Sequence, residues 1–70
     1  MKREIGSTLL RIIELSSILN LSQNTTEMMA RRLENTQNSK ETLLKAKGLL
    51  TILEESKTEE AVLKKLGEAQ

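Results

Sequence analysis

The chain has 70 residues, a net charge of +1 from 11 basic and 10 acidic side chains, and neither cysteine nor histidine. It also lacks aromatic residues and proline, so its apolar content of 37% consists of aliphatic side chains, methionine and alanine. These counts exclude disulfides, thiolate and imidazole catalysis and the main transition-metal ligands. The balanced charge provides no long-range attraction toward nucleic acid or an anionic membrane.

A single domain of this size, residues 1–70, buries only about 60% of the surface that its unfolded chain exposes, so its stability is marginal without help. Abundant helix-forming residues and the absence of period-two alternation predict an all-α fold. We expect a small bundle of three to four helices, completed by dimerisation or by a partner chain. No apolar run is long enough to span a bilayer, and charged residues interrupt the apolar start, so we expect a cytoplasmic protein without a signal peptide.

The first helix is predicted at about residues 3–21. Some of its apolar side chains form one stripe along the helix. Other apolar side chains, among them Leu10 and Ile13, lie well outside this stripe. A stripe this wide indicates a helix that is covered on more than one side. The polar residues that follow are poor in a helix interior and good at a helix start, which favours a break near residues 22–25. The alternative is a long bent helical hairpin, in which residues 3–36 form one helix.

Three further helices are predicted at about residues 25–36, 39–55 and 58–66. Their starts carry the spacing of a capping box, in which one side chain caps a free amide and a glutamate reaches back. The pairs are Asn24 with Glu27, Asn38 with Glu41, and Ser56 with Glu59, and Thr58 is an alternative cap for the last helix. A straight continuation of the third helix would turn Val62, Leu63 and Leu66 roughly 145° away from its apolar face, which predicts a break within residues 54–60. Gly67 is expected to end the last helix.

No arrangement of residues indicates catalysis. The six serines have no predicted activating partner and are assigned to helix caps and surface, and the three glycines are isolated, so none forms a phosphate loop. We therefore expect no enzyme activity, no cofactor, no metal site and no small-molecule substrate. Gly48, in a predicted helix interior, is compatible with a close helix crossing or with an ordinary surface position.

A DNA-binding helix-turn-helix over residues 25–48 is the most specific alternative function, with Ala30 where its two helices would meet. Two positions that are normally apolar in such a motif hold Asn35 and Lys40, and burying both would be costly. The chain also lacks the basic surface expected of DNA-binding proteins. These observations do not favour nucleic acid as a partner.

Protein association fits the sequence best, because the apolar faces are wider than one hairpin can cover. We expect a non-enzymatic interaction module, such as an oligomerising adaptor, a chaperone-like subunit or a small regulator, that binds a protein partner or itself as a homodimer. The predicted interface has a heptad-like spacing in the third helix and counterparts in the first. Its residues are Leu43, Ala46, Leu50 and Leu53, with Leu9 and Ile12 opposite. The alternative is that these residues form the internal core of a monomer.

Overall fold

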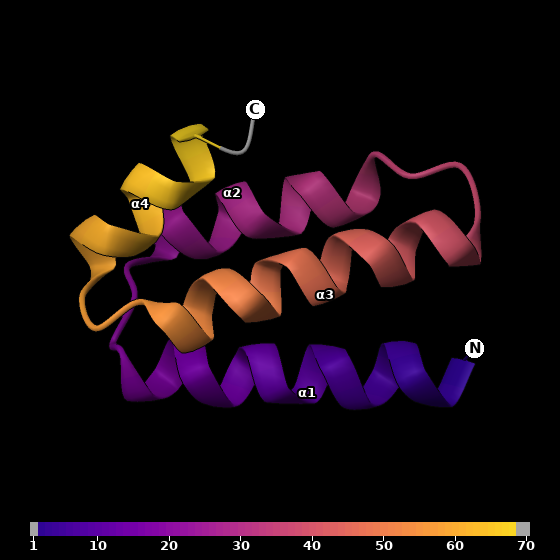
Figure 1. The fold of residues 1–70 in the computed structure, drawn as a ribbon, viewed down its shortest axis with the longest axis horizontal. Helices are drawn as coiled ribbons and strands as arrows, with labels where there is room; N and C mark the ends of the chain where they lie inside the picture. Colours follow the sequence, from indigo (N-terminus) through magenta and orange to yellow (C-terminus); the bar gives the residue numbers. More distant parts are fainter. Residues whose placement is uncertain (1, 69–70) are drawn as a thin grey trace.

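The computed structural model of the chain describes residues 2–68, and within this range it consists of four α-helices (Figure 1). They are α1 (Lys2–Ile18), α2 (Gln23–Glu34), α3 (Ser39–Glu55) and α4 (Glu59–Glu68). This confirms the prediction of a small all-α bundle. The break between α1 and α2 also rules out the alternative of one bent helix over residues 3–36. No helix of the described range is both long enough and apolar enough to cross a membrane.

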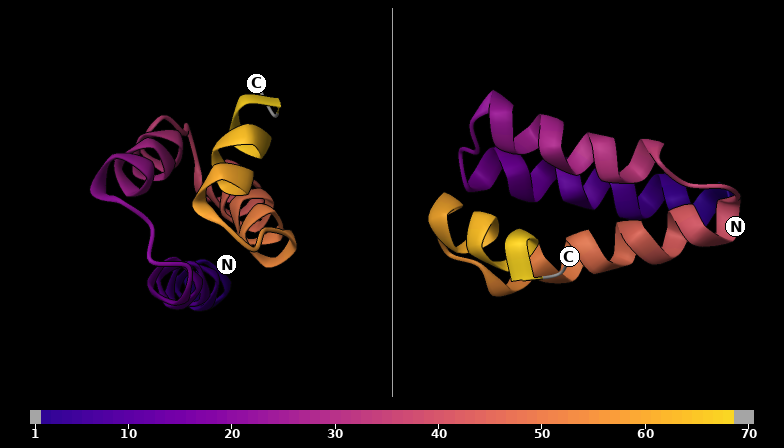
Figure 2. Two further views of the ribbon diagram at one scale, coloured as in Figure 1. Left: turned by 90° about the vertical axis from the view of Figure 1, so that its left-hand side faces the viewer. Right: turned by 90° about the horizontal axis from the view of Figure 1, so that it is seen from above.

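The first three helices lie side by side, with α1 and α3 running in one direction and α2 in the other (Figure 1). Seen end-on, they form a triangle, and α4 packs near α3 at the end where α1 stops and α2 begins (Figure 2). The closest approach is between α1 and α3, whereas α2 and α4 approach α3 over shorter stretches. Helix α3 is therefore the central element of the chain.

The core is aliphatic and every helix contributes to it. Three of its fully buried members come from α3, and α4 supplies two more. The buried cluster consists of Ile12, Met29, Ala46, Leu49, Leu53, Val62 and Leu66. Buried hydroxyls do not disturb it, because those of Thr8 and Ser56 donate to carbonyls four residues earlier, Glu4 at 2.7 Å and Ile52 at 2.6 Å.

Helix α1 ends three residues earlier than predicted because the chain turns sharply at Asn20. This residue has φ of 55°, a left-handed conformation that asparagine tolerates better than most residues. The Asn20 amide donates to the Ser17 carbonyl at 3.1 Å and the Leu21 amide to the Ser16 carbonyl at 3.1 Å. These two bonds form a Schellman motif, which satisfies the last carbonyls of α1.

The predicted capping pairs had different outcomes. Asn38 does cap α3, accepting from the Glu41 amide at 2.9 Å, although the Glu41 carboxylate reaches back to the Gln37 amide instead of that of Asn38. The assignment of Asn24 as a cap is wrong: α2 starts two residues earlier, with Ser22 as its N-cap. An N-cap needs an extended backbone just outside the helix, and Ser22 has one.

The predicted box of Ser56 with Glu59 is also wrong. Ser56 ends α3, and its amide donates to the Leu53 carbonyl at 3.3 Å, while the Thr58 hydroxyl accepts from the Ala61 amide at 3.2 Å and caps α4. Helix α4 continues to Glu68 and so passes Gly67, which does not adopt the left-handed conformation of a helix-ending glycine.

Two polar contacts connect α4 with α2, which we call the α2–α4 clamp. At one end, the Glu59 carboxylate accepts from the Ser22 amide and, at 2.9 Å, from the buried Thr25 hydroxyl. The Ser22 amide, followed by the hydroxyls of Ser22 and Thr25, lowers the pKa of Glu59. At the other end, the Arg32 guanidinium donates to the Leu66 carbonyl in the last turn of α4. A negative charge thus lies at the start of α2 and a positive charge at the end of α4, both favourable for the helix dipoles.

Candidate functional site

The structure places the six residues of the predicted interface in or against the core. Leu43, Ala46, Leu53 and Ile12 are buried. Leu50 and Leu9 are half-buried and pack against the core cluster. The chain's own helices cover these residues, as expected from the alternative in which they form the internal core of a monomer. Their part in binding a partner stays a prediction, and a surface that is open in the single chain has to include other residues.

The most exposed pair of neighbouring aliphatic side chains lies on the outside of α1. Leu10 is 63% exposed and Ile13 is 64% exposed. Residues three apart in a helix are neighbours on its surface, so the two form one continuous ridge, which we call the α1 ridge. The other exposed large aliphatic residues of the described range occur singly, at Ile18, Met28, Leu44 and Leu63.

A hollow of about 260 Å³ lies next to this ridge, between α1 and α2, and we call it the α1–α2 groove. Its lining residues are Leu9, Ile12, Ile13 and Ser16 from α1 and Thr26, Met29, Ala30 and Leu33 from α2. The two hydroxyls in this lining are already engaged within their own helices, since Ser16 donates to the Ile12 carbonyl at 2.8 Å and Thr26 to the Ser22 carbonyl at 3.1 Å. The groove therefore presents an apolar surface.

The two sides of the groove differ in charge. On α2, Ala30 lines the groove, and the exposed side chains Glu27 and Glu34 lie three residues before it and four after it. Both are surface neighbours of Ala30 on the helix, and the exposed Arg31 lies one turn from each, so the α2 rim carries two acidic side chains and one basic side chain. On α1, the ridge residues Leu10 and Ile13 make the side next to the groove aliphatic, and the exposed Arg3 lies on the same side of the helix as Leu10. A ligand for this groove has to match an aliphatic wall and a negative edge.

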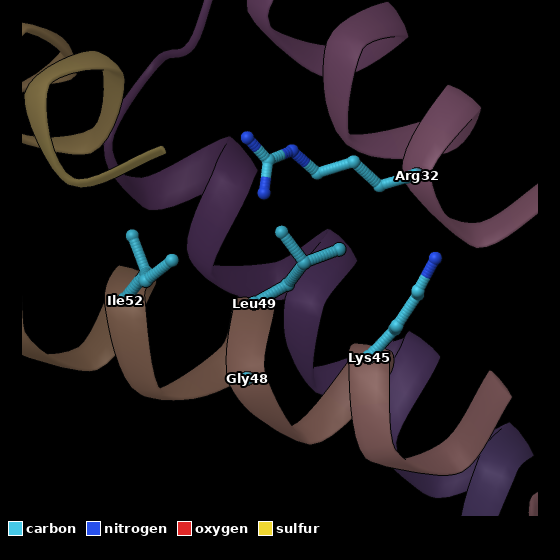
Figure 3. A pocket seen from close by; sticks show the side chains of 5 residues that line it. All are labelled: Arg32, Lys45, Gly48, Leu49 and Ile52. Atoms are coloured by element: carbon cyan, nitrogen blue, oxygen red, sulfur yellow. The ribbon is translucent and has the colours of Figure 1, made fainter. Parts of the chain in front are cut away.

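A second hollow, of about 420 Å³, lies between α2 and α3. Figure 3 shows Leu49 and Ile52 of α3 projecting into it, with Arg32 reaching across from α2 and Lys45 beside them. The two cations are partly occupied within the chain, because Arg32 donates to the Leu66 carbonyl and Lys45 to the Asn35 carbonyl at 3.3 Å. Gly48 is exposed here, and no atom of another helix lies within 4 Å of the position that a Cβ would take, so it is a surface glycine and not a close helix crossing.

The structure assembles no metal-binding cluster in the part of the chain that it describes. Histidine and cysteine are absent, so metal ligands of the usual side-chain types would have to be acidic residues. Residues 2–68 contain no group of three or more acidic side chains that could hold a metal ion. The lining of the hollow between α2 and α3 consists of the two cations, Gly48 and the aliphatic side chains of Leu49 and Ile52.

The helix pair considered for DNA binding is an antiparallel hairpin, in which α2 and α3 lie side by side (Figures 1 and 2). A helix-turn-helix crosses at roughly 90–120° instead. Asn35 and Lys40, which stand at normally apolar positions of that motif, are both exposed. The polar residues are therefore accommodated by a different helix packing.

Sequence reasoning missed the groove but contained one signal for it. The aliphatic residues outside the main stripe of α1 indicate that something other than α3 covers this helix. The two groove residues predicted as interface, Leu9 and Ile12, form its α1 side together with Ile13. The α2 side could not be found, because its contribution depends on how far α2 stands from α1.

Comparisons of the chain with protein-family models, with curated proteins and with solved structures give no match.

Proposed function

We propose that this chain is a protein-binding module without enzyme activity, and that the α1 ridge and the α1–α2 groove together form its binding surface. The observation that supports this most directly is the exposure of Leu10 and Ile13, 63% and 64%, at the edge of an apolar groove. Covering one large aliphatic side chain completely stabilises a complex by about 1.5–3 kcal/mol. A partner that covers the ridge gains part of this contribution from each of Leu10 and Ile13.

The shape of the surface suits an aliphatic helix as its ligand. Grooves between helices commonly take up an amphipathic helix, which is anchored by side chains three or four residues apart. Ala30 leaves space on the α2 side for such an anchor, because its side chain is a single methyl group. This mode of binding is compatible with an oligomerising adaptor, a chaperone-like subunit or a small regulator.

The absence of enzyme activity is proposed from the composition, since the chain has no histidine and no cysteine as a base or nucleophile. A DNA-binding role has no specific observation in its favour. The antiparallel packing of α2 and α3 and the net charge of +1 both argue against it.

Site-specific photo-crosslinking in the cells that make the protein tests this proposal. A photoreactive amino acid at position 10 or 13 of the full chain is expected to give a defined protein adduct, identified by mass spectrometry. The matched control is position 51, an exposed residue on α3, which is expected to give none. The proposal is overturned if positions 10 and 13 give no adduct, or if position 51 gives the same adduct with the same yield.

A further inference from the structure

The ridge and the groove lie next to each other on one face of the molecule and share Ile13. A second copy of the chain presents the same two features. Two-fold symmetry allows the ridge of each copy to meet the groove of the other, in a closed contact that leaves neither feature exposed. We infer that the partner of this face is a second copy of the chain, an inference that rests on the proposed function. The chain is thus expected to form a homodimer through α1 and α2.

The charges around the face support a second copy as the partner. Arg3 is exposed and lies seven residues, or two helical turns, before Leu10 on the same side of α1. Among the ion pairs of the described residues, Arg3, Glu27 and Glu34 have none, whereas Arg11 pairs with Glu14 at 3.1 Å. An approaching α1 therefore brings the cation Arg3 toward a rim whose net charge is negative, because Arg31 offsets only one of the two glutamates. This complementarity fixes the orientation of the contact more than it adds to its strength.

The chain also carries the type of helix that the groove requires. In the described range, α1 is the only helix with two exposed large aliphatic residues one turn apart. Within one chain Leu10 lies outside the groove, whereas the α1 ridge of a second copy can enter it. The net charge of +1 means that two copies repel each other little.

Light scattering and sedimentation velocity on the purified full chain test the inference over a dilution series. We expect a dimer that dissociates on dilution. Ile13→Glu is expected to raise the dissociation constant by about a hundredfold or more, because it buries a charge among aliphatic side chains. The matched control is Leu44→Glu, since Leu44 is also 64% exposed but lies alone on α3, and it is expected to leave dimerisation unchanged. Helical circular dichroism checks that both variants fold.

Charge reversal tests the orientation of the contact. Arg3→Glu is expected to weaken the dimer about three- to tenfold at low salt and less at high salt, because rim charges are screened. Combining it with Glu27→Lys and Glu34→Lys is expected to restore part of the affinity. A loss that is not recovered in the combined variant would place Arg3 away from the α2 rim and overturn this orientation.

A wild-type chain that stays monomeric at high concentration overturns the inference, and so does a dimer that tolerates Ile13→Glu. The photo-crosslink at position 13 separates this failure from failure of the proposed function. An adduct with a different protein keeps the binding surface and rejects the second copy, whereas the absence of any adduct rejects both.

Discussion

Helix α1 has two neighbours and meets them in different ways. Against α3 it packs closely along its length. The core residue Ala46 of α3 is fully buried. An exposed ion pair, Lys47 to Glu4 at 3.8 Å, lies at the edge of this contact. Against α2 it leaves a groove. Ala30 of α2 lines this groove together with aliphatic side chains and, unlike Ala46, remains exposed.

This difference shows that the two helices beside α1 are positioned by different forces. Helix α3 is held by burial of aliphatic surface, which is distributed over the whole contact. Helix α2 also buries Met29 and Thr25, and it makes further contacts at its ends. These are the turn at Asn20, the Ser22 cap and the α2–α4 clamp.

Enlarging an alanine on each side of α1 separates the two situations. Ala46→Leu is expected to lower the free energy of unfolding by about 1–3 kcal/mol, because extra methyl groups cannot enter a packed core without strain. Ala30→Leu is expected to change it by less than about 0.5 kcal/mol, because the new side chain has the groove to occupy. Urea unfolding followed by circular dichroism measures both, at a protein concentration where the chain is monomeric.

Equal destabilisation by the two alanine variants would contradict this comparison, because it would mean that the groove is as closely packed as the contact between α1 and α3. Ala46→Gly is a useful third variant. It removes volume instead of adding it. If Ala46→Gly lowers the free energy of unfolding and Ala46→Leu does not, the cause is lower helix propensity and a cavity, and not overpacking.

The turn between α1 and α2 is the next place to test. Asn20→Ala is expected to destabilise the chain by about 1 kcal/mol, because alanine fits the left-handed conformation poorly, whereas Asn20→Gly is expected to be neutral or stabilising. Asn24→Ala is the control, since Asn24 is exposed in the first turn of α2 and is not its cap. A loss of stability from Asn24→Ala comparable to that from Asn20→Ala would contradict the assignment of the turn. Urea unfolding at one protein concentration compares the three variants.

The helices could be predicted from the sequence where local signals decide them. The bounds of α3 match the predicted residues 39–55, because Asn38 caps its start and the change of apolar phase marks its end. The end of α1 and the start of α2 were each displaced by two or three residues. Asn20 and Ser22 compete there with several other polar residues, and the sequence does not reveal which of them takes the left-handed turn and which takes the cap.

The functional surface was less predictable, for a different reason. Leu10, Ile13 and the core residues of α1 have the same aliphatic chemistry, and only their direction relative to α3 decides which are exposed. Likewise, Glu59 has the spacing of a capping box with Ser56, but its actual partner, Ser22, lies 37 residues away. Propensity and spacing report on neighbours along the chain, whereas the groove and the clamp depend on contacts between distant segments.

The α2–α4 clamp provides the smallest expected effect and a dependence on pH. Hydrogen bonds from Ser22 and Thr25 lower the pKa of Glu59 in the folded chain. The clamp therefore stabilises the folded chain at pH values above the ordinary glutamate pKa of about 4.3. This contribution is lost as the pH falls below that value and through the lowered pKa. Glu59→Gln is therefore expected to be slightly less stable than the wild type at pH 7, with a difference that shrinks under acidic conditions.

Amide hydrogen exchange at Ser22 identifies the cause of this effect, because the Ser22 amide donates directly to the Glu59 carboxylate. The amide is expected to exchange faster in Glu59→Gln than in Glu60→Gln, which removes the same charge from the exposed neighbouring residue. If the Ser22 amide exchanges equally fast in both variants, the total charge at the start of α4 protects it and the clamp does not. If only Glu59→Gln differs, and α2 also becomes more mobile relative to α1, then the groove depends on a contact made by α4.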